Sequence, residues 1–230
     1  HAAHMAVLEA AKAAGITRFI QLSAICVQKP LLEFQHAKLA FEAALMESGL
    51  TYSIVRPTAY FKSLSGQVGR LRVGKPFLLF GDGALTACKP ISDADLARFM
   101  VGCLHDPERA NAILPIGGPG PAMTPREQGE ALFEALGIAP RFAHVPVAMM
   151  DAIIAGLRLG GLVSRRARDK AELARIGRYY ATESMLVWDR RAGRYDADAT
   201  PETGRDRLQE FYRKLARGEA VVDLGEHAVF

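Results

Sequence analysis

Apolar residues in the first sixty positions alternate between helical and strand-like spacing. Ala2 to Ala14 places them along one helical face, and Arg18 to Ser23 is a short apolar strand. Glu33 to Ser48 is helical again, and Thr51 to Val55 predicts a second strand. Each helix ends before a glycine. This rhythm is typical of right-handed βαβ crossovers, which build a parallel sheet.

After Pro57 the pattern is less regular, although caps and turn residues still mark the elements. We expect further helices at Ser63–Val73, from the cap Ser92 to Leu104, Thr124–Leu136, Ala148–Leu159, Arg165–Tyr180 and Thr203–Arg217. We expect further strands at Lys75–Phe80, Asn111–Ile116, Phe142–Val145 and Ser184–Trp188, with a polar loop at Arg190–Thr200. Gly160-Gly161 should separate two helices, and Met149 and Met150 should fill the core.

The predicted fold class is α/β, a Rossmann-type parallel sheet with helices on both faces plus a smaller C-terminal α+β lobe. Residues 1–60 should form the C-terminal part of an NADP-binding domain. Residues 61–230 should form a substrate lobe interleaved with the remaining Rossmann elements. Because the chain begins with a helix and no strand precedes it, we expect the first strands of the sheet to be absent.

Composition narrows the class of protein. Half of the 230 residues are hydrophobic and 23% are charged, which is typical of a folded chain and not of a disordered one. No apolar run reaches the roughly 18 residues that a transmembrane helix needs, and no secretory signal opens the chain. Three cysteines without metal spacing favour a reducing cytoplasm, and three histidines (His36, His105, His144) lie too far apart to suggest a metal site.

The net charge of +4 is concentrated in one segment. Between Ser164 and Arg194 there are nine basic and four acidic residues. Such a face suits an anionic substrate, a peripheral contact with an anionic membrane, or solubility alone. It lacks the interleaved aromatic residues of a single-strand nucleic-acid binder, so we expect no nucleic-acid partner.

Candidate chemistry lies at the end of the first strand and on the next helix. Ser23 ends a strand at the edge where parallel sheets bind ligands, and Lys38 lies on the following helix. In short-chain reductases a strand-end Ser joins a Tyr and a Lys four residues apart on one helix face. Here Phe34 stands at the Tyr position. Since a phenylalanine cannot protonate an alkoxide, this favours reduction of a conjugated C=C bond over a C=O bond, although Phe34 as a core residue is a simpler interpretation.

The next strand ends in Arg56-Pro57-Thr58. A proline at this point places a sharp turn at the same edge, where backbone N–H groups can hold a carboxamide. Together the two strand ends predict a cofactor-facing edge of the sheet, which we call the rim: Ser23, Ala24, Pro57 and Thr58.

Several strings carry a more specific resemblance: 23–38 (SAICVQKPLLEFQHAK), 56–64 (RPTAYFKSL), 80–83 (FGDG), 88–92 (CKPIS) and 180–185 (YATESM). From about Leu8 to Phe211 the chain resembles the divinyl chlorophyllide a 8-vinyl-reductases, in the NmrA-like, atypical branch of the short-chain dehydrogenase/reductases. One motif of that family, the N-terminal glycine-rich loop that approaches the pyrophosphate, is not in the sequence.

The resemblance implies NADPH-dependent reduction of the 8-vinyl group of divinyl chlorophyllide or protochlorophyllide to ethyl, in chlorophyll or bacteriochlorophyll synthesis. It implies that Lys38 contacts the nicotinamide ribose and that Ser23 donates a hydrogen bond nearby. Ala24, Pro57 and Thr58 would line the nicotinamide. On the substrate side we expect Ile25, Cys26, Phe61 and Lys62. The proton donor stays open between Lys38, Cys26 and a water molecule.

Two alternatives remain at this stage. One is a non-catalytic NmrA-like regulator that senses NADP, which Phe34 favours. The other is a reductase of the same branch that acts on another conjugated alkene, which is compatible with Lys38 in the absence of the Tyr.

Overall fold

The computed structural model describes residues 2–161 and 164–221. The chain divides into two compact units, each built from three segments. Unit 1 comprises residues 1–59, 89–120 and 186–206. Unit 2 comprises residues 60–88, 121–185 and 207–230, of which 162–163 and 222–230 lie outside the described residues.

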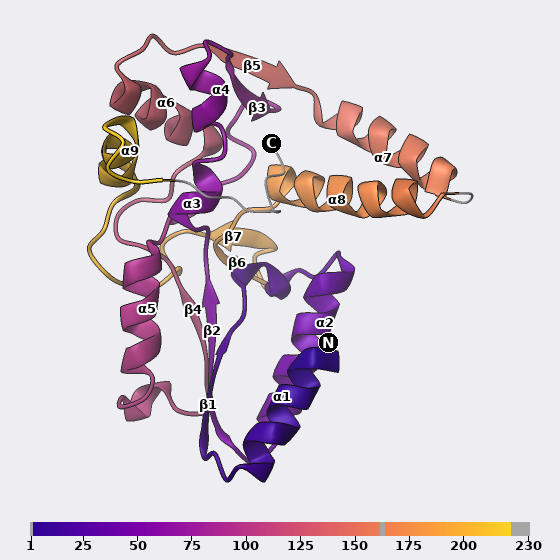
Figure 1. The fold of residues 1–230 in the computed structure, drawn as a ribbon, viewed down its shortest axis with the longest axis vertical. Coiled ribbons are helices and arrows are strands. Elements are labelled where there is room, and N and C mark those ends of the chain that lie inside the picture. Colours follow the sequence, from indigo (N-terminus) through magenta and orange to yellow (C-terminus); the bar gives the residue numbers. More distant parts are fainter. Residues whose placement is uncertain (1, 162–163, 222–230) are drawn as a thin grey trace. The chain divides into compact units, whose positions relative to one another are not determined.

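Unit 1 is built on a parallel sheet of β1 (Arg18–Leu22), β2 (Thr51–Pro57) and β4 (Ala112–Ile116), in the order β1-β2-β4. Leu22 lies beside Val55, and Val55 beside Leu114. Helices α1 (Ala2–Ala13) and α2 (Glu33–Met46) lie on one side of the sheet, and α5 (Asp93–Gly102) lies on the other (Figure 1). The predicted Rossmann-type arrangement is therefore confirmed.

The core of unit 1 follows from the apolar faces of these elements. Leu8 of α1, Phe41 and Leu45 of α2 and Ile54 of β2 are almost fully buried in one cluster. Phe41 and Leu45 are four residues apart and so share a helix face. This packing fixes α2 against the sheet, and with it every functional side chain that α2 carries.

Two short 3₁₀ helices complete the crossovers of unit 1: η1 (Ile25–Gln28) directly after β1, and η2 (Pro107–Arg109) before β4. The predicted loop at Arg190–Thr200 is partly wrong, because it contains β7 (Arg194–Asp196), which pairs antiparallel with β6 (Val187–Asp189). Gly193 has a φ of 63° at the turn, a conformation that glycine adopts readily. The turn therefore makes a hairpin where the polar composition suggested only a loop.

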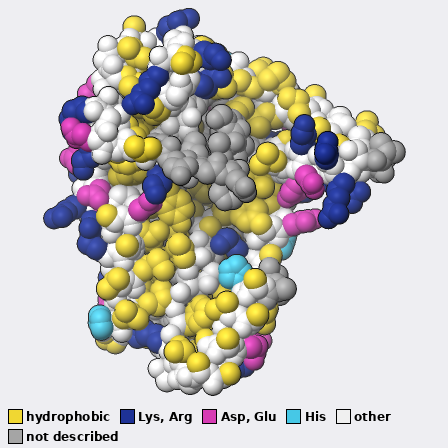
Figure 2. All heavy atoms as spheres, in the orientation of Figure 1, with side chains coloured by type: hydrophobic (Ala, Val, Ile, Leu, Met, Phe, Trp, Pro, Cys, Tyr) yellow, Lys and Arg dark blue, Asp and Glu magenta, His cyan; other side chains and the backbone are white. Residues whose placement is uncertain are grey.

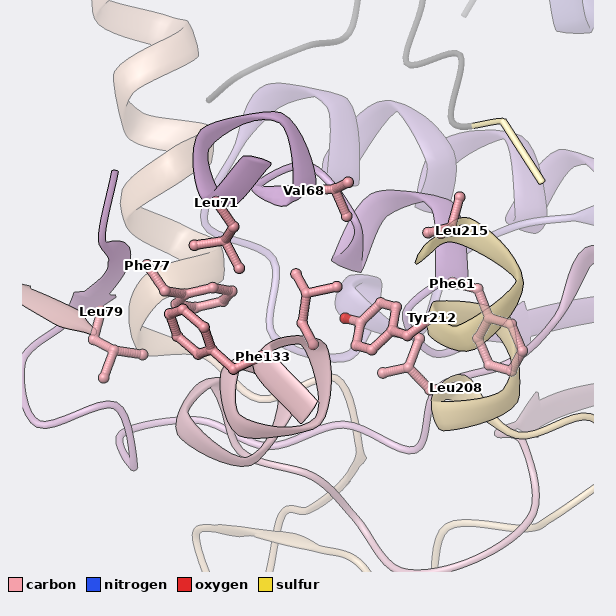
Figure 3. Packing of buried hydrophobic residues seen from close by; sticks show 10 residues of the cluster. Phe61, Val68, Leu71, Phe77, Leu79, Phe133, Leu208, Tyr212 and Leu215 are labelled. Carbon is pink, nitrogen blue, oxygen red and sulfur yellow. The ribbon is translucent and has the colours of Figure 1, made fainter. Parts of the chain in front are cut away.

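Unit 2 combines a two-stranded parallel sheet, β3 (Phe77–Phe80) with β5 (Phe142–Val145), and six helices among its described residues. These are α3 (Phe61–Leu64), α4 (Val68–Arg72), α6 (Pro125–Leu136), α7 (Val147–Gly161), α8 (Arg165–Thr182) and α9 (Leu208–Ala216). Its core gathers Phe77, Phe133 and Tyr212 with their aliphatic neighbours (Figure 3). The Tyr212 hydroxyl donates to the carbonyl of Leu64 at 2.9 Å, which satisfies a fully buried polar group.

The single helix expected at Ser63–Val73 is instead two short helices, α3 and α4. The Gln67 side chain lies between them and bonds both backbone groups of Leu78, accepting from its N–H at 2.7 Å and donating to its carbonyl at 3.0 Å. The Gln67 side chain thus pairs with the β3 backbone. These tertiary hydrogen bonds explain why residues 63–73 do not form one continuous helix, although their sequence pattern is helical.

Two further expectations are corrected. The last helix begins at Leu208 rather than Thr203, because the backbone of residues 205 and 206 bonds the Asp95 carboxylate instead. Met149, expected in the core, is 48% exposed on α7. The Gly160-Gly161 pair lies inside the end of α7, so the break between α7 and α8 comes after it.

Candidate functional site

The ends of β1 and β2 form one edge of the unit 1 sheet. The Ser23 N–H donates to the carbonyl of Val55 at 2.7 Å, so Ser23 continues the β1–β2 pairing by one residue. The Thr58 N–H donates to the carbonyl of Ile116 at 2.9 Å in the same way beside β4. The sequence-predicted rim residues Ser23, Ala24, Pro57 and Thr58 therefore lie at one sheet edge. This is the carboxyl edge, where doubly wound sheets bind ligands.

The Ser23 side chain is 3% exposed and bonds a charged partner. Its hydroxyl donates to the Glu42 carboxylate, which also accepts from Arg56 Nε at 3.2 Å and from Arg56 Nη2. The Glu42 side chain is 1% exposed and the Arg56 side chain 14%. A charge-assisted, two-point contact of this kind fixes both side chains, which in turn orients the serine hydroxyl.

Glu42 was not among the predicted site residues. It lies four residues after Lys38, so the two share a face of α2. The available signal was an acidic side chain next to Phe41, within the apolar face that packs on the sheet. Buried carboxylates need a partner, and Arg56 at the end of the next strand was the natural candidate.

Lys38 and Phe34 lie one turn apart in the first half of α2, and both are partly buried. Within the described residues Lys38 makes no hydrogen bond or ion pair to protein atoms. A partly buried lysine with no partner among these residues is suited to a polar ligand. Phe34 supplies only an apolar ring at the position where a phenol would stand.

The turn after β1 is held by Gln35, which is fully buried. Its Oε1 accepts from the N–H groups of Leu31 and Leu32 at 2.7 and 2.9 Å, and its Nε2 donates to the Cys26 carbonyl at 3.1 Å. The predicted substrate-side residues Ile25 and Cys26 are only 1% and 4% exposed. Both residues are therefore buried rather than exposed at an open surface.

Thr58 is 5% exposed, and its hydroxyl donates to the carbonyl of Lys89. The Lys89 ammonium donates in turn to the carbonyl of Thr200 at 3.2 Å and to Glu202 Oε1 at 2.7 Å. The Thr58 hydroxyl is therefore part of a structural network that ties the rim to the 186–206 segment.

The other two predicted substrate-side residues belong to unit 2. Phe61 is 4% exposed and packs in the unit 2 core, 5.5 Å from the Phe211 ring between ring centroids. Lys62 is exposed on α3.

These residues suit one part of a nicotinamide dinucleotide and not another. The rim and Lys38 fit its nicotinamide and ribose, because they combine backbone groups at a sheet edge with an available cation. The glycines that follow β4 do not suit the pyrophosphate: a Cβ on Gly118 would lie 1.8 Å from the Pro90 carbonyl oxygen, so these glycines allow close backbone packing. The residues at this sheet edge could thus hold the nicotinamide end of a dinucleotide.

The chain is similar to NAD(P)H-binding proteins and to one group of reductases. A family profile described as NAD(P)H-binding matches residues 1–107. Divinyl chlorophyllide a 8-vinyl-reductase, chloroplastic, of Cucumis sativus is 54% identical over 97% of the chain and 55% of its own length. The protein of the same name from Arabidopsis thaliana is 52% identical over 95% of the chain and 54% of its own length. The chain spans about half the length of the curated relatives it matches.

Solved structures share the fold at low sequence identity. An NADPH-dependent quinone oxidoreductase of Escherichia coli, crystallised with NADPH, is 20% identical and covers 92% of the chain and 70% of its own length, with a TM-score of 0.63. A nucleoside-diphosphate-sugar epimerase of Staphylococcus aureus is 17% identical, covers 91% of the chain and 69% of its own length, and also has a TM-score of 0.63. Among the described residues, no helix combines the length and the apolar character needed to cross a membrane.

Proposed function

Because the chain belongs to the family of the divinyl chlorophyllide a 8-vinyl-reductases, we propose that it is part of an NADPH-dependent reductase that converts the 8-vinyl group of divinyl chlorophyllide or protochlorophyllide to ethyl. The observation that carries this proposal is the extent of the match. The NAD(P)H-binding profile ends at residue 107, whereas the reductase match runs through both units. In this proposal unit 1 holds the cofactor.

The bound NADPH would supply a hydride to a carbon of the vinyl group. The chain's own residues bind the cofactor and orient its nicotinamide ring. The Lys38 ammonium donates to the nicotinamide ribose. The Ser23 hydroxyl donates its hydrogen to Glu42, so toward a ligand at the nicotinamide end its oxygen can accept a hydrogen bond. Ala24, Pro57 and Thr58 contribute backbone and methyl groups beside that ring.

Reduction of the vinyl group also consumes one proton. Phe34 cannot supply it, since its ring carries no exchangeable hydrogen. The conjugated macrocycle can delocalise the charge that the hydride brings, so the proton need not arrive at once from a fixed phenol. The candidate donors are Lys38 Nζ, the Cys26 thiol and a water molecule at the rim.

On the substrate side we propose Lys62, whose exposed ammonium suits a propionate carboxylate. Ile25 and Cys26 of η1 and Phe61 of α3 are proposed as further substrate-side residues, and all three are buried. The cytoplasm remains the proposed location, based on three buried free cysteines in the described residues. The plant relatives carry the word chloroplastic in their own names.

The experiment uses the protein with any native flanking sequence retained, incubated with NADPH and divinyl chlorophyllide. We expect a blue shift of the Soret band, because removing a conjugated double bond shortens the π-system. Lys38→Ala should slow this shift by about a hundredfold or more. Lys12→Ala, which removes an exposed cation of α1, is the matched control and should leave the rate unchanged.

An unchanged spectrum together with intact NADPH binding would favour the NADP-sensing regulator instead. A shift obtained with a different conjugated alkene, and not with divinyl chlorophyllide, would favour the other reductase.

A further inference from the structure

Helix α7 of unit 2 exposes an almost entirely apolar surface. Nine of its residues are solvent-exposed, and seven of these have no polar side-chain atom: Ala148, Met149, Ala152, Ile153, Ala155, Gly156 and Leu159. Met149, Ile153 and Leu159 are 48%, 49% and 71% exposed. A surface helix normally turns charged residues to the solvent, so this pattern is reversed. We call these seven residues the α7 face.

The opposite side of α7 already has a partner. Ile154 and Gly161 are buried, and α7 packs along α8 as an antiparallel pair (Figure 1). A Cβ added to Gly160 would lie 3.5 Å from Ala167, in ordinary contact, so the two helices approach closely at this end. Packing against α8 therefore leaves the α7 face exposed, and an exposed apolar surface of this kind is typical of an interaction site.

The two exposed charged residues of α7 do not interrupt the face. Asp151 and Arg158 are seven residues apart, so they lie on one stripe beside it. Asp151 is bonded to Arg178 of α8, with 3.4 Å between Oδ2 and Nη2. This ion pair fixes α7 on α8 and leaves the apolar stripe continuous.

Exposed cations gather at the end of the α7–α8 pair. Arg158, Arg165, Arg166, Arg168 and Lys170 are all exposed, against one exposed acid, Asp169, in residues 158–170. Figure 2 shows hydrophobic side chains over α7 and Lys and Arg side chains where α7 ends and α8 begins. An apolar helix face beside a cationic cluster is the pattern of helices that lie in the interface of an anionic bilayer.

We propose that the α7 face docks the protein on an anionic lipid surface, with the apolar side chains at the headgroup boundary and the cationic cluster among the phosphates. A second copy of the chain is a poorer occupant. The chain carries a net charge of +4, so a second copy offers the cationic cluster less opposite charge than an anionic bilayer does. The inference does not depend on the proposed reaction, because neither α7 nor α8 carries a residue assigned to it.

The test is co-sedimentation of the protein, with any native flanking sequence retained, with vesicles of phosphatidylcholine containing about a third phosphatidylglycerol. We expect binding that weakens as ionic strength rises above about 0.15 M, and much weaker binding to phosphatidylcholine alone. The double variant Ile153→Glu, Leu159→Glu should reduce binding by more than about tenfold. Val101→Glu with Leu104→Glu is its matched control, since these side chains are 59% and 49% exposed in unit 1.

The charge contribution has its own matched pair of variants. Replacing Arg165, Arg166 and Lys170 by Gln should reduce binding to the anionic vesicles by on the order of a hundredfold. Replacing the exposed Arg190, Arg191 and Arg194 by Gln changes the net charge equally and should have a small effect. Circular dichroism verifies that each variant is folded.

Three results would overturn the proposal. One is the absence of vesicle binding. Another is vesicle binding that survives the Ile153, Leu159 double variant. The third is a concentration-dependent dimer in analytical ultracentrifugation that the same double variant dissociates, which would assign the α7 face to a second copy. None of these results bears on the reductase assay.

Discussion

The Ser23 hydroxyl donates to the carboxylate of Glu42, and this contact joins the end of β1 to the middle of α2. Arg56, at the end of β2, bonds the same carboxylate. One buried acid thus connects three consecutive elements of the unit 1 sheet at the edge where the cofactor is proposed to bind. Since Lys38 lies one turn away on α2, the acid also helps to set the distance between the proposed serine and lysine contacts.

Glu42→Gln should destabilise the protein by about 3 kcal/mol, because it leaves the largely buried Arg56 guanidinium without its counter-charge. The variant should also lower kcat more than it raises the KM for NADPH, since a misplaced Ser23 hydroxyl affects the geometry of the reacting groups. Urea unfolding and steady-state kinetics measure the two effects. Glu47→Gln, an exposed acid at the end of the same helix, is the control and should be nearly neutral in both.

A double-mutant cycle separates orientation from simple loss of stability. If Glu42 acts through Ser23, then Ser23→Ala should cost little further activity once Glu42 is Gln. Fully additive losses in kcat would show that the two residues act independently and would contradict a positioning role for Glu42.

Phe34→Tyr restores a phenol one turn before Lys38. We expect the rate of vinyl reduction to change by less than about threefold, because proton delivery to a delocalised anion gains little from one more fixed acid. The Soret assay at saturating NADPH measures this rate. A large increase would mean that the proton-transfer step limits the native reaction and that the phenol supplies a missing donor.

The alternation of helices, glycines and apolar strands was sufficient to predict the sheet of unit 1. β1 and β2 lie within two residues of their expected bounds, and the caps Ser92 and Thr124 accept from backbone N–H groups as predicted. These features depend on local spacing and on hydrogen bonds between residues that are three positions apart. Local sequence therefore contains the information needed to place them.

What the sequence did not reveal depends on contacts between distant segments. Gln67 leaves a helical pattern to bond Leu78, and residues 205 and 206 bond Asp95 more than a hundred positions earlier. Glu42 was missed for the same reason, since its role appears only when Ser23 and Arg56 are placed beside it.

Cys88 should be unreactive in the native protein. Burial raises the pKa of its thiol to about 12, and only the Gln128 amide, 3.3 Å away, opposes this effect. At pH 8 roughly one molecule in ten thousand would carry the thiolate, the reactive form. We expect no modification of Cys88 by N-ethylmaleimide in native protein and complete modification in urea, measured by peptide mass spectrometry. Rapid native labelling would show that this part of unit 2 opens readily.

Asp95 joins α5 to the segment that precedes α9. Its carboxylate is buried and accepts from the N–H groups of Arg205 at 3.0 Å and Asp206 at 2.8 Å, and from the Arg98 side chain. A Cβ on Gly204, whose φ is 82°, would collide with the same carboxylate, so the segment approaches as closely as glycine allows. Within unit 1 the contact ties residues 204–206 to α5.

The stability that Asp95 provides should depend on pH. Burial by itself would raise the pKa of this carboxyl, but the hydrogen bonds from Asp206, Arg98 and Arg205 hold it below its ordinary value. Its contribution is therefore present above the unfolded-state pKa of about 4 and is lost as pH falls through the lower folded-state pKa. Asp95→Asn should cost about 2 kcal/mol at pH 7, and the difference from wild type should shrink below pH 4. Urea unfolding at pH 7 and pH 3 measures both values, with the exposed Asp93→Asn as control; a difference that stays constant with pH would show that Asp95 is not ionised in the folded protein.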